Sequence, residues 1–522
     1  MKWRLLWIYI FTLIVLQNQM AQLPLMFTPN SYPLPAITEG EFVNENEFAL
    51  RDGLPNVIAK MKRGEHVMVG FLGGSITNSD ESYRNQTLQY LQKQYPNVEL
   101  YGVNAGVPGT GTELGAFRLQ EQILDYHPDL VFVEFAVNGG SANAIEGIVR
   151  QIIQNNPKTD ICFIYTLLAS QTSFYLLGNM PTNAKLYDAV ASHYNLPSIH
   201  FGYRIAQMEK DGLLIGKAAQ GSVTDKIIFS YDGTHPSREG GNIYVQSIAY
   251  AWKEFEKNSI EKPHLLPAKM VSDNWELATM FKPDQGATLS SEWKNVVAPS
   301  DTRFTQFKDW FPTITSCDKT GASMTIKFEG DKIGLFDIGG PEVGIVEVEV
   351  DGVIGKEFNR FNTYCNNRYR GQYFFTDLTW GKHTVVFRLS AKQSDKYTIL
   401  GTNQLTDITA HPEKYAKQEL YIGRILLRGK LIASETSLNN LQLNNLKLSP
   451  NPVRDFLNLK IDNNDNQSMN ISLFNSGGKK EYLQTSTFKS EIKIEVTGLQ
   501  KGVYFCRLEN GKNNETVKFI KQ

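Results

Sequence analysis

Residues 66–260 alternate short apolar runs with longer amphipathic stretches, and this alternation restricts the fold more than any other feature of the chain. Four runs are hydrophobic nearly throughout and have the length of strands: 67–72, 98–103, 130–136 and 161–168. The stretches 79–94 and 184–194 have the composition and length of helices. Strands that are apolar on both sides belong in a parallel sheet covered by helices, so an α/β domain of three layers is predicted.

The pattern changes in the segment 265–431, where polar and apolar residues alternate one by one. The clearest alternation falls in three stretches, 324–328, 345–350 and 383–389. The pairs Asp351-Gly352 and Trp380-Gly381 have the composition of turns. Antiparallel strands joined by turns are typical of a β-sandwich or jelly roll, which we expect for this all-β domain.

The C-terminal part of the chain predicts a third domain. Residues 432–446 are rich in Ser, Asn and Leu and are expected to form a linker. Residues 447–522 contain alternating runs of strand length separated by Asn and Gly, which favours a small Ig-like β-sandwich. A chain of 522 residues exceeds the size at which one core stops growing, so several domains are expected.

The N-terminus has the features of an export signal. Two basic residues precede the apolar run 5–16, and the small Ala21 suits a cleavage site. The run is short for a bilayer span, so a signal peptide over 1–21 is expected, followed by a lead-in segment over 22–65. No later run is long enough to span. The mature protein is therefore expected to have no stable membrane span and to be secreted or held at the cell surface.

Charge and cysteine content limit the partners. The formal net charge is −1, and nucleic-acid binding needs a basic field, so no nucleic-acid partner is expected. Four cysteines are too few for a disulfide scaffold. Cys317 and Cys365 fall in the same predicted domain, where a disulfide and two buried free thiols are both open alternatives.

Four short motifs in a fixed order contain the polar groups that point to chemistry. They are Gly73-Gly74-Ser75-Ile76-Thr77, Asn104-Ala105-Gly106, Ala136-Val137-Asn138 and Asp232-Gly233-Thr234-His235. The first three follow predicted strands, at the edge where α/β sheets bind ligands. Together the motifs supply a serine, a backbone N–H, an amide side chain and an Asp–His pair, which are the groups that acyl transfer requires.

The fourth motif is the most discriminating. With a spacing of three residues, Asp232 can accept a hydrogen bond from one imidazole nitrogen of His235 while the other nitrogen faces Ser75. His235 would then act as base toward Ser75 and as acid toward the leaving alcohol. Taken singly, Ser75 suits a helix cap and Asn138 a turn. A loop ion pair or a metal site would also use Asp232 and His235, but the other seven His are scattered singly, so no metal and no cofactor are expected.

The order and spacing of the four motifs resemble those of the SGNH (GDSL-type) hydrolase family across the whole α/β domain. The resemblance implies that the oxyanion is met by the N–H of Ser75, the N–H of Gly106 and the side chain of Asn138. The family usually has aspartate before the serine and after the asparagine, where this chain has Gly74 and Gly139. These departures imply a less typical rim around the active site.

The C-terminal domain shows a second resemblance. A Pro-Asn-Pro motif at 450–452 and a Gly-Val-Tyr motif at 502–504 resemble the sorting domain of cargo for the type IX secretion system of Bacteroidetes. The resemblance implies that the type IX secretion machinery is a partner and that the domain serves as an address. An ordinary Ig-like module is the alternative.

These features together predict a secreted serine ester hydrolase that removes O-acetyl groups from carbohydrate or polysaccharide through an acyl-enzyme. A lipase or acylhydrolase acting on longer acyl esters is one alternative, and a non-catalytic carbohydrate-binding surface protein is the other. Aromatic residues of the all-β domain are candidates for sugar stacking, although such residues usually fill a core. They are Trp275, Trp293, Trp310, Tyr364, Tyr369, Tyr373, Phe374 and Phe375.

Overall fold

The computed structural model divides into two compact units, residues 1–431 and 432–522, which are described separately. The described residues are 25–29, 44–257, 259–432, 447–460, 467–475, 480–488, 491–510 and 513–522. The expected signal peptide at 1–21 lies outside these residues, as does the expected linker at 432–446 apart from its first residue.

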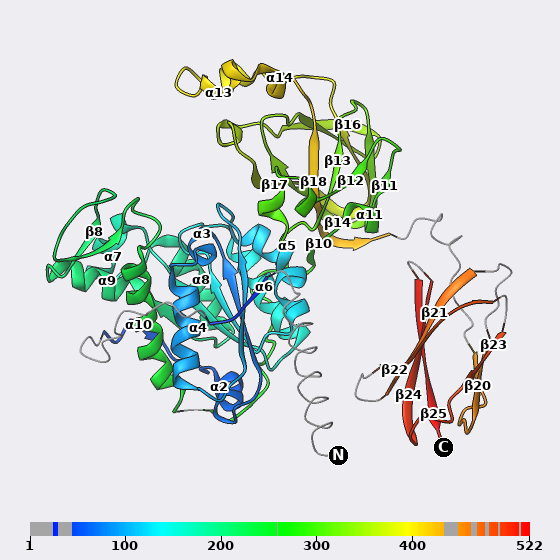
Figure 1. The fold of residues 1–522 in the computed structure, drawn as a ribbon. Coiled ribbons are helices and arrows are strands. Elements are labelled where there is room, and N and C mark those ends of the chain that lie inside the picture. The colour runs from blue at the N-terminus through cyan, green and yellow to red at the C-terminus, as the bar shows by residue number, and fades with distance from the viewer. Residues whose placement is uncertain are drawn as a thin grey trace, which may run out of the picture. The chain divides into compact units, whose positions relative to one another are not determined.

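The larger unit begins with a twisted sheet buried between two layers of helices (Figure 1). Over the described residues the order across the sheet is β1 (Met26–Phe27), β4 (Leu100–Gly106), β3 (Val67–Gly73), β5 (Leu130–Glu134), β6 (Asp160–Tyr165), β7 (Ser198–His200) and β2 (Phe48–Ala49). The strands from β4 to β7 are parallel, and the short β1 and β2 pair antiparallel at the edges. The predicted strands correspond to β3, β4, β5 and β6, and the α/β fold with a parallel sheet is confirmed.

Helices cover both faces of this sheet. One face is covered by α5 (Thr112–Gln122), α6 (Ala142–Asn155) and α8 (Thr182–His193), and the other by α2 (Pro55–Lys62), α4 (Tyr83–Gln94), α9 (Phe201–Lys210) and α10 (Arg238–Phe255). Their apolar residues recur at helical spacing, as Ile145, Ile148 and Ile152 do on α6, and all three are fully buried. A short α7 (Thr172–Leu176) and the parallel pair β8 (Leu214–Lys217) and β9 (Ile227–Ser230) complete this domain.

The helix expected over 79–94 is shorter in the structure. A single-turn α3 (Ser75–Asn78) comes first, and α4 begins only at Tyr83. The Arg84 guanidinium of α4 donates to the carbonyls of Thr77 and Asn78, at 2.9 and 3.3 Å. These bonds satisfy the carbonyls at the end of α3, so the chain can turn away from the helix there.

The second domain is an antiparallel sheet whose long strands curl around a core of their own. Its order is β12 (Lys294–Val297), β13 (Thr313–Cys317), β18 (Leu420–Leu431), β14 (Ser323–Gly339), β17 (Arg370–Leu389), β15 (Ile345–Val350) and β16 (Val353–Asn359). β10 (Ala278–Phe281) pairs with β18, and β11 (Thr288–Leu289) pairs with β14. The short helices are α11 (Pro283–Gly286), α12 (Lys396–Leu400), α13 (Thr406–Ala410) and α14 (Pro412–Tyr415). The predicted all-β domain is confirmed.

One of the two turns predicted in this domain is wrong. Asp351 and Gly352, with φ of 52° and 83°, do form the turn between β15 and β16. Gly381, in contrast, lies inside β17 and pairs with Gly330 of β14 at an irregularity in the ladder. A Cβ at Gly330 would lie 2.2 Å from the carbonyl oxygen of Arg428. Gly330 therefore allows β14 and β18 to approach closely, whereas a Cβ at Gly381 would have its nearest neighbour, the Nε2 of His383, at 3.6 Å, so Gly381 simply continues β17.

The two domains of the larger unit share one apolar core. Phe117 of α5 contacts Trp275 and Phe375, with ring centroids 5.2 and 5.9 Å apart. Beside them, Arg424 of β18 forms an ion pair with Glu121 of α5, with Nε 2.7 Å from Oε2. Two of the aromatic residues considered for sugar stacking are therefore used to join the domains.

The smaller unit contains two antiparallel sheets over its described residues, as a small sandwich requires. One consists of β19 (Lys447–Ser449), β20 (Phe456–Lys460) and β23 (Glu491–Glu495). The other consists of β22 (Lys480–Phe488), β21 (Gln467–Asn475), β24 (Gly502–Asn510) and β25 (Asn513–Lys521). Leu457, Leu473 and Phe519 belong to the apolar cluster between them and are fully buried.

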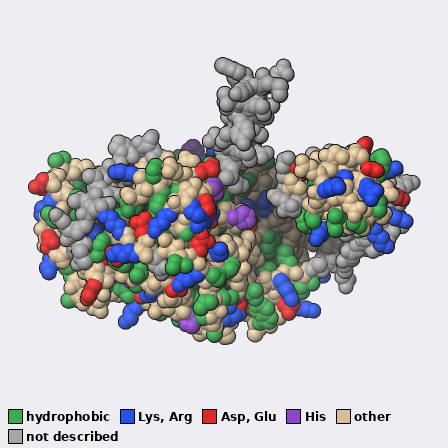
Figure 2. All heavy atoms as spheres, turned by 90° about the horizontal axis from the view of Figure 1, so that it is seen from below, with side chains coloured by type: hydrophobic (Ala, Val, Ile, Leu, Met, Phe, Trp, Pro, Cys, Tyr) green, Lys and Arg blue, Asp and Glu red, His purple; other side chains and the backbone are tan. Residues whose placement is uncertain are grey.

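The structure also answers the question about the cysteines and shows how charge and apolar helices are distributed. All four cysteines are free and buried, so the pairing of Cys317 with Cys365 that the sequence left open is not formed. On the face seen in Figure 2, Lys and Arg side chains are interspersed with Asp and Glu. Among the helices that the structure describes, none is long and apolar enough to cross a membrane.

Candidate active site

The first three motifs meet at the carboxyl edge of the parallel sheet. Gly73, the last residue of β3, pairs with Gly106 at the end of β4 and with Glu134 at the end of β5. Ser75 begins α3 directly after β3, and Asn138 follows β5. The register of three strands thus brings the nucleophile candidate and both distant oxyanion candidates to one place.

The fourth motif reaches the same place from the loop after β9. The Nε2 of His235 lies 2.7 Å from the Oγ of Ser75, and its Nδ1 lies 2.6 Å from the Oδ2 of Asp232. The side chains of His235 and Asp232 are 44% and 56% exposed. The structure therefore forms an unbroken hydrogen-bonded chain from Asp232 through His235 to Ser75, at the surface and accessible to a substrate.

Asp232 is held by its own loop. Its Oδ1 accepts from the amides of Thr234 and His235, both at 2.8 Å. Partial burial raises the pKa of Asp232, but the bonds from the His235 ring and from these amides outweigh it, so the pKa lies well below its ordinary value. The loop also needs Gly233, whose φ is +87°. Asp232 is thus a fixed, ionised acceptor that orients the imidazole.

Asn138 lies directly against Gly74. A Cβ added at Gly74 would lie 2.1 Å from the Oδ1 of Asn138 and 2.7 Å from its Nδ2. The Asn138 Oδ1 is buried and has no hydrogen-bond partner among the described residues. Gly74 stands where the family usually has aspartate. Because it has no side chain, the amide of Asn138 can lie directly beside the start of α3.

Gly106 is also tightly enclosed. Its N–H donates to the Oδ1 of Asn104 at 3.1 Å, and a Cβ at this position would lie 2.4 Å from the backbone nitrogen of Asn78. The N–H of Gly106 therefore has an internal acceptor in this structure. An oxyanion bound to the Gly106 N–H would share this donor with the Asn104 side chain or would displace that side chain from it.

Glu134 is a residue of the site that the motifs did not reveal. It is fully buried and accepts from the hydroxyls of Thr77 at 2.9 Å and Thr166 at 2.6 Å, and from the amides of Gly74 and Thr77. Burial raises the pKa of Glu134, and these bonds partly oppose the rise. The carboxylate holds the turn that presents Ser75. The sequence did indicate that Glu134 is unusual, because it is the one charged residue in the apolar run 130–136, where an ionisable group would be buried.

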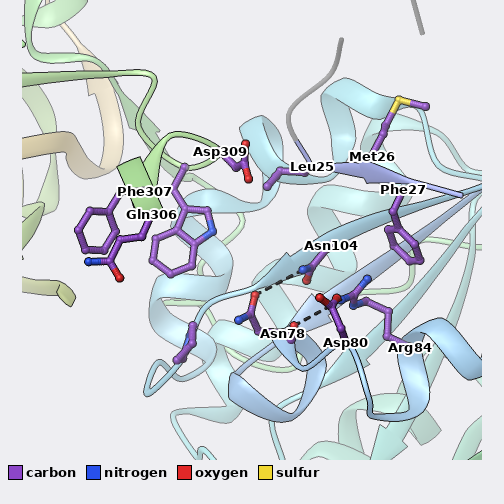
Figure 3. Close-up of a pocket in the computed structure, with 12 residues that line it drawn as sticks. Leu25, Met26, Phe27, Asn78, Asp80, Arg84, Asn104, Gln306, Phe307 and Asp309 are labelled. Atoms are coloured by element: carbon purple, nitrogen blue, oxygen red, sulfur yellow. Dashed lines mark hydrogen bonds and ion pairs between the residues drawn. The ribbon is translucent and has the colours of Figure 1, made fainter. Parts of the chain in front are cut away.

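A cavity of about 410 Å³ opens between the two domains beside this site (Figure 3). It adjoins Asn78, the last residue of α3, and Asn104, the partner of Gly106. Its polar and aromatic lining includes Asn78, Asp80 and Asn104 from the first domain and Gln306, Asp309 and Trp310 from the second. Of the aromatic residues considered for sugar stacking, Trp310 is the one in this lining, while Trp275 and Trp293 are buried.

The fold and the site define a class: an α/β domain with a Ser–His–Asp chain at the carboxyl edge of its parallel sheet. Residues 71–242 match the model of the GDSL-like Lipase/Acylhydrolase family, and residues 447–522 match that of the secretion system C-terminal sorting domain. Both resemblances found in the sequence are confirmed. The chain carries a carboxylic ester hydrolase domain of the GDSL (SGNH) type and a type IX sorting domain, which indicates secretion or attachment at the cell surface.

Solved structures with related folds include a two-domain esterase (CEX) active on acetylated mannans, crystallised with mannopentaose. It aligns with 75% of this chain and 99% of its own, at 20% identity and a TM-score of 0.56. An acetylxylan esterase (Axe2) from Geobacillus stearothermophilus covers 35% of this chain and 93% of its own, at 15% identity and a TM-score of 0.28. A lipase/acylhydrolase from Enterococcus faecalis covers 38% and 100%, at 20% identity and a TM-score of 0.28.

The first of these likenesses extends over both domains of the larger unit, so it shows a shared two-domain fold. A search of curated protein sequences found no significant match.

Proposed function

We propose that this protein hydrolyses carboxylic esters through an acyl-enzyme formed on Ser75. The observation that carries the proposal is the chain of short contacts from Asp232 through His235 to Ser75. His235 takes the proton of the Ser75 hydroxyl as its oxygen attacks the ester carbonyl, and then gives that proton to the leaving alcohol. Water repeats the sequence on the acyl-enzyme and releases the acid. Asp232 keeps the imidazole in the correct tautomer throughout.

The negative charge that develops on the carbonyl oxygen needs donors fixed in advance. We assign this role to the backbone N–H of Ser75, the N–H of Gly106 and the Nδ2 of Asn138. The contact between Gly74 and Asn138 supports the assignment, since it keeps the amide close to the start of α3. Glu134 acts as a positioning residue, because it binds the turn and not the substrate.

For the substrate, we propose O-acetyl groups on a carbohydrate or polysaccharide. The two-domain fold resembles that of an esterase active on acetylated mannans, and the match to a sorting domain supports secretion or attachment at the cell surface, where a polysaccharide substrate would be met. The cavity beside the site supports the same choice. Carboxylates and amides that accept and donate hydrogen bonds, next to an indole, are the groups that bind the hydroxyls and the apolar face of a sugar ring.

The deciding experiment compares acyl chains and leaving groups on the purified enzyme. We expect hydrolysis of acetyl esters to exceed that of butyryl and octanoyl esters, and we expect acetate to be released from acetylated mannan or xylan. Ser75→Ala protein, prepared in parallel, controls for contaminating esterases. Preference for octanoyl esters would indicate a lipase, and absence of any Ser75-dependent turnover would indicate a carbohydrate-binding protein without activity.

The cavity yields a separate prediction. Asp309→Ala and Trp310→Ala are expected to raise KM for acetylated oligosaccharides about tenfold, the equivalent of ~1.4 kcal/mol of binding, and to leave p-nitrophenyl acetate hydrolysis unchanged. The small ester does not reach the cavity, whereas a sugar chain would. Trp380→Ala is the matched control, since Trp380 is 53% exposed on β17 and is not in the cavity lining. Equal KM values for all three variants and the wild type would refute a sugar site here.

We further propose that the signal peptide over 1–21 is removed during export and that residues 447–522 are recognised by the type IX secretion machinery. The match of these residues to the sorting domain family supports the second step.

A further inference from the structure

A buried arginine lies behind the active site without an acidic partner. Arg118 of α5 is 0% exposed, and no Asp or Glu of the described chain forms an ion pair with it. Its Nε has no hydrogen-bond partner among the residues that the structure describes. Burial lowers the pKa of Arg118 to about 9, so the side chain is still charged at neutral pH. A buried, unpaired cation is expensive, so its retention calls for an explanation.

The hydrogen bonds of Arg118 explain why a buried cation is retained at this position. Its Nη1 donates to the carbonyl oxygen of Ala105 at 2.5 Å, and its Nη2 donates to that of Gly73 at 2.8 Å. The remaining bond, from Nη1 to the Oε1 of Gln122 at 2.7 Å, stays within α5. Arg118 therefore binds two carbonyls inside the first two motifs, that of Gly73 at the end of β3 and that of Ala105, one residue before the end of β4.

Each of these carbonyls belongs to a peptide group whose N–H is that of the next motif residue, Gly106 or Gly74. The carbonyl of Ala105 shares its peptide plane with the N–H of Gly106, the assigned oxyanion donor. The carbonyl of Gly73 shares its plane with the N–H of Gly74, which donates to Glu134. A positive charge at the oxygen end of a peptide group strengthens the N–H at its other end as a donor, because hydrogen bonds in a chain polarise one another.

We propose that Arg118 is a positioning residue of the oxyanion hole, which fixes and polarises the Ala105–Gly106 and Gly73–Gly74 peptide groups from behind. The inference rests on the proposed function. The same role accounts for the burial of two opposite charges, Arg118 and Glu134, on either side of the Gly73–Gly74 peptide group. Arg118 binds the oxygen of that peptide group and Glu134 binds its N–H, so the two charges act on one dipole from opposite ends.

The test separates this role from that of a structural tie between β3 and β4. Arg118→Met keeps the volume and removes the charge, and Arg118→Lys keeps the charge but cannot bind both carbonyls. With p-nitrophenyl acetate, we expect Arg118→Met to lower kcat by about tenfold to a hundredfold, somewhat less than the loss of a whole oxyanion donor, with KM within about twofold. The affinity for a boronic acid that forms a tetrahedral adduct on Ser75 should fall by the same factor. Arg118→Lys should lie between Arg118→Met and the wild type.

Two controls match these variants. Gln122→Met removes the one partner of Arg118 that does not lead to the site. Arg150→Met removes another buried arginine, on α6, which binds Glu276 and touches none of the strand ends. Both are expected to keep the wild-type kcat, even where their melting temperature falls.

Wild-type kcat and boronic acid affinity in the folded Arg118 variants would overturn the proposal and leave a structural role only. If Arg118→Met does not fold, Arg118→Lys decides by the same criteria. Failure of the proposed function itself would be seen separately, as activity that survives Ser75→Ala.

Discussion

Ser75→Ala is expected to lower kcat for p-nitrophenyl acetate by about 10⁴-fold or more, the scale of loss seen when a hydrolase loses its nucleophile. The Oγ of Ser75 is the atom that His235 contacts at 2.7 Å, and alanine leaves the imidazole with nothing to deprotonate. KM and melting temperature should change little, because Ser75 is a partly exposed residue at the start of a single-turn helix. Initial rates on protein of equal concentration and verified fold measure the effect.

The matched control is Ser79→Ala, at the other end of α3, which should retain wild-type activity. Because the triad acts as a unit, adding His235→Ala to Ser75→Ala should cost almost nothing more. A Ser75→Ala enzyme that works at the wild-type rate would exclude the acyl-enzyme mechanism.

Gly74→Ala is the second change with a large expected effect, although it removes no polar group. Its Cβ would lie 2.1 Å from the Oδ1 of Asn138 and must displace that amide. The φ of Gly74 is −96°, outside the left-handed region, so the cost comes from the contact and not from the backbone. We expect kcat for p-nitrophenyl acetate to fall by about 10²-fold to 10³-fold, as for the loss of one oxyanion donor.

A double-mutant cycle checks the cause of this loss. Asn138→Ala alone should reduce kcat to a similar extent, and Gly74→Ala added to it should have little further effect, because no amide is left to displace. Losses that multiply in the double variant would mean that Gly74 and Asn138 act independently, which would refute the steric explanation.

The fold was largely predictable because its signals are local. The apolar runs that became β3, β4, β5 and β6 are continuous in sequence, and strands that are apolar on both sides indicate a parallel sheet covered by helices. The break between α3 and α4 was not predictable, since it depends on bonds from Arg84 to carbonyls that precede it. The place of Gly381 inside β17 was hidden for a similar reason, because it depends on pairing with Gly330 of another strand.

The candidate site likewise contains residues with a local sequence signal and residues that only their contacts identify. Ser75, Asp232 and His235 were predicted from short motifs in a fixed order, and the structure brings their side chains into one hydrogen-bonded chain. No role was predicted for Arg118 or for the Asn104 side chain, because both bind backbone groups, and sequence does not indicate which backbone group a side chain will reach. Polar residues behind a catalytic site are identified by their partners, and those partners come from separate strands.

The aromatic contact of Phe117 with Trp275 and Phe375 has a practical consequence for how this molecule can be divided. Removing residues 265–431 would uncover the apolar side of α5, so a truncated hydrolase domain would aggregate and would not report on carbohydrate binding. The boundary at residue 431 is the place where the chain can be shortened without cutting a core. A cut there would leave both domains of the larger unit whole.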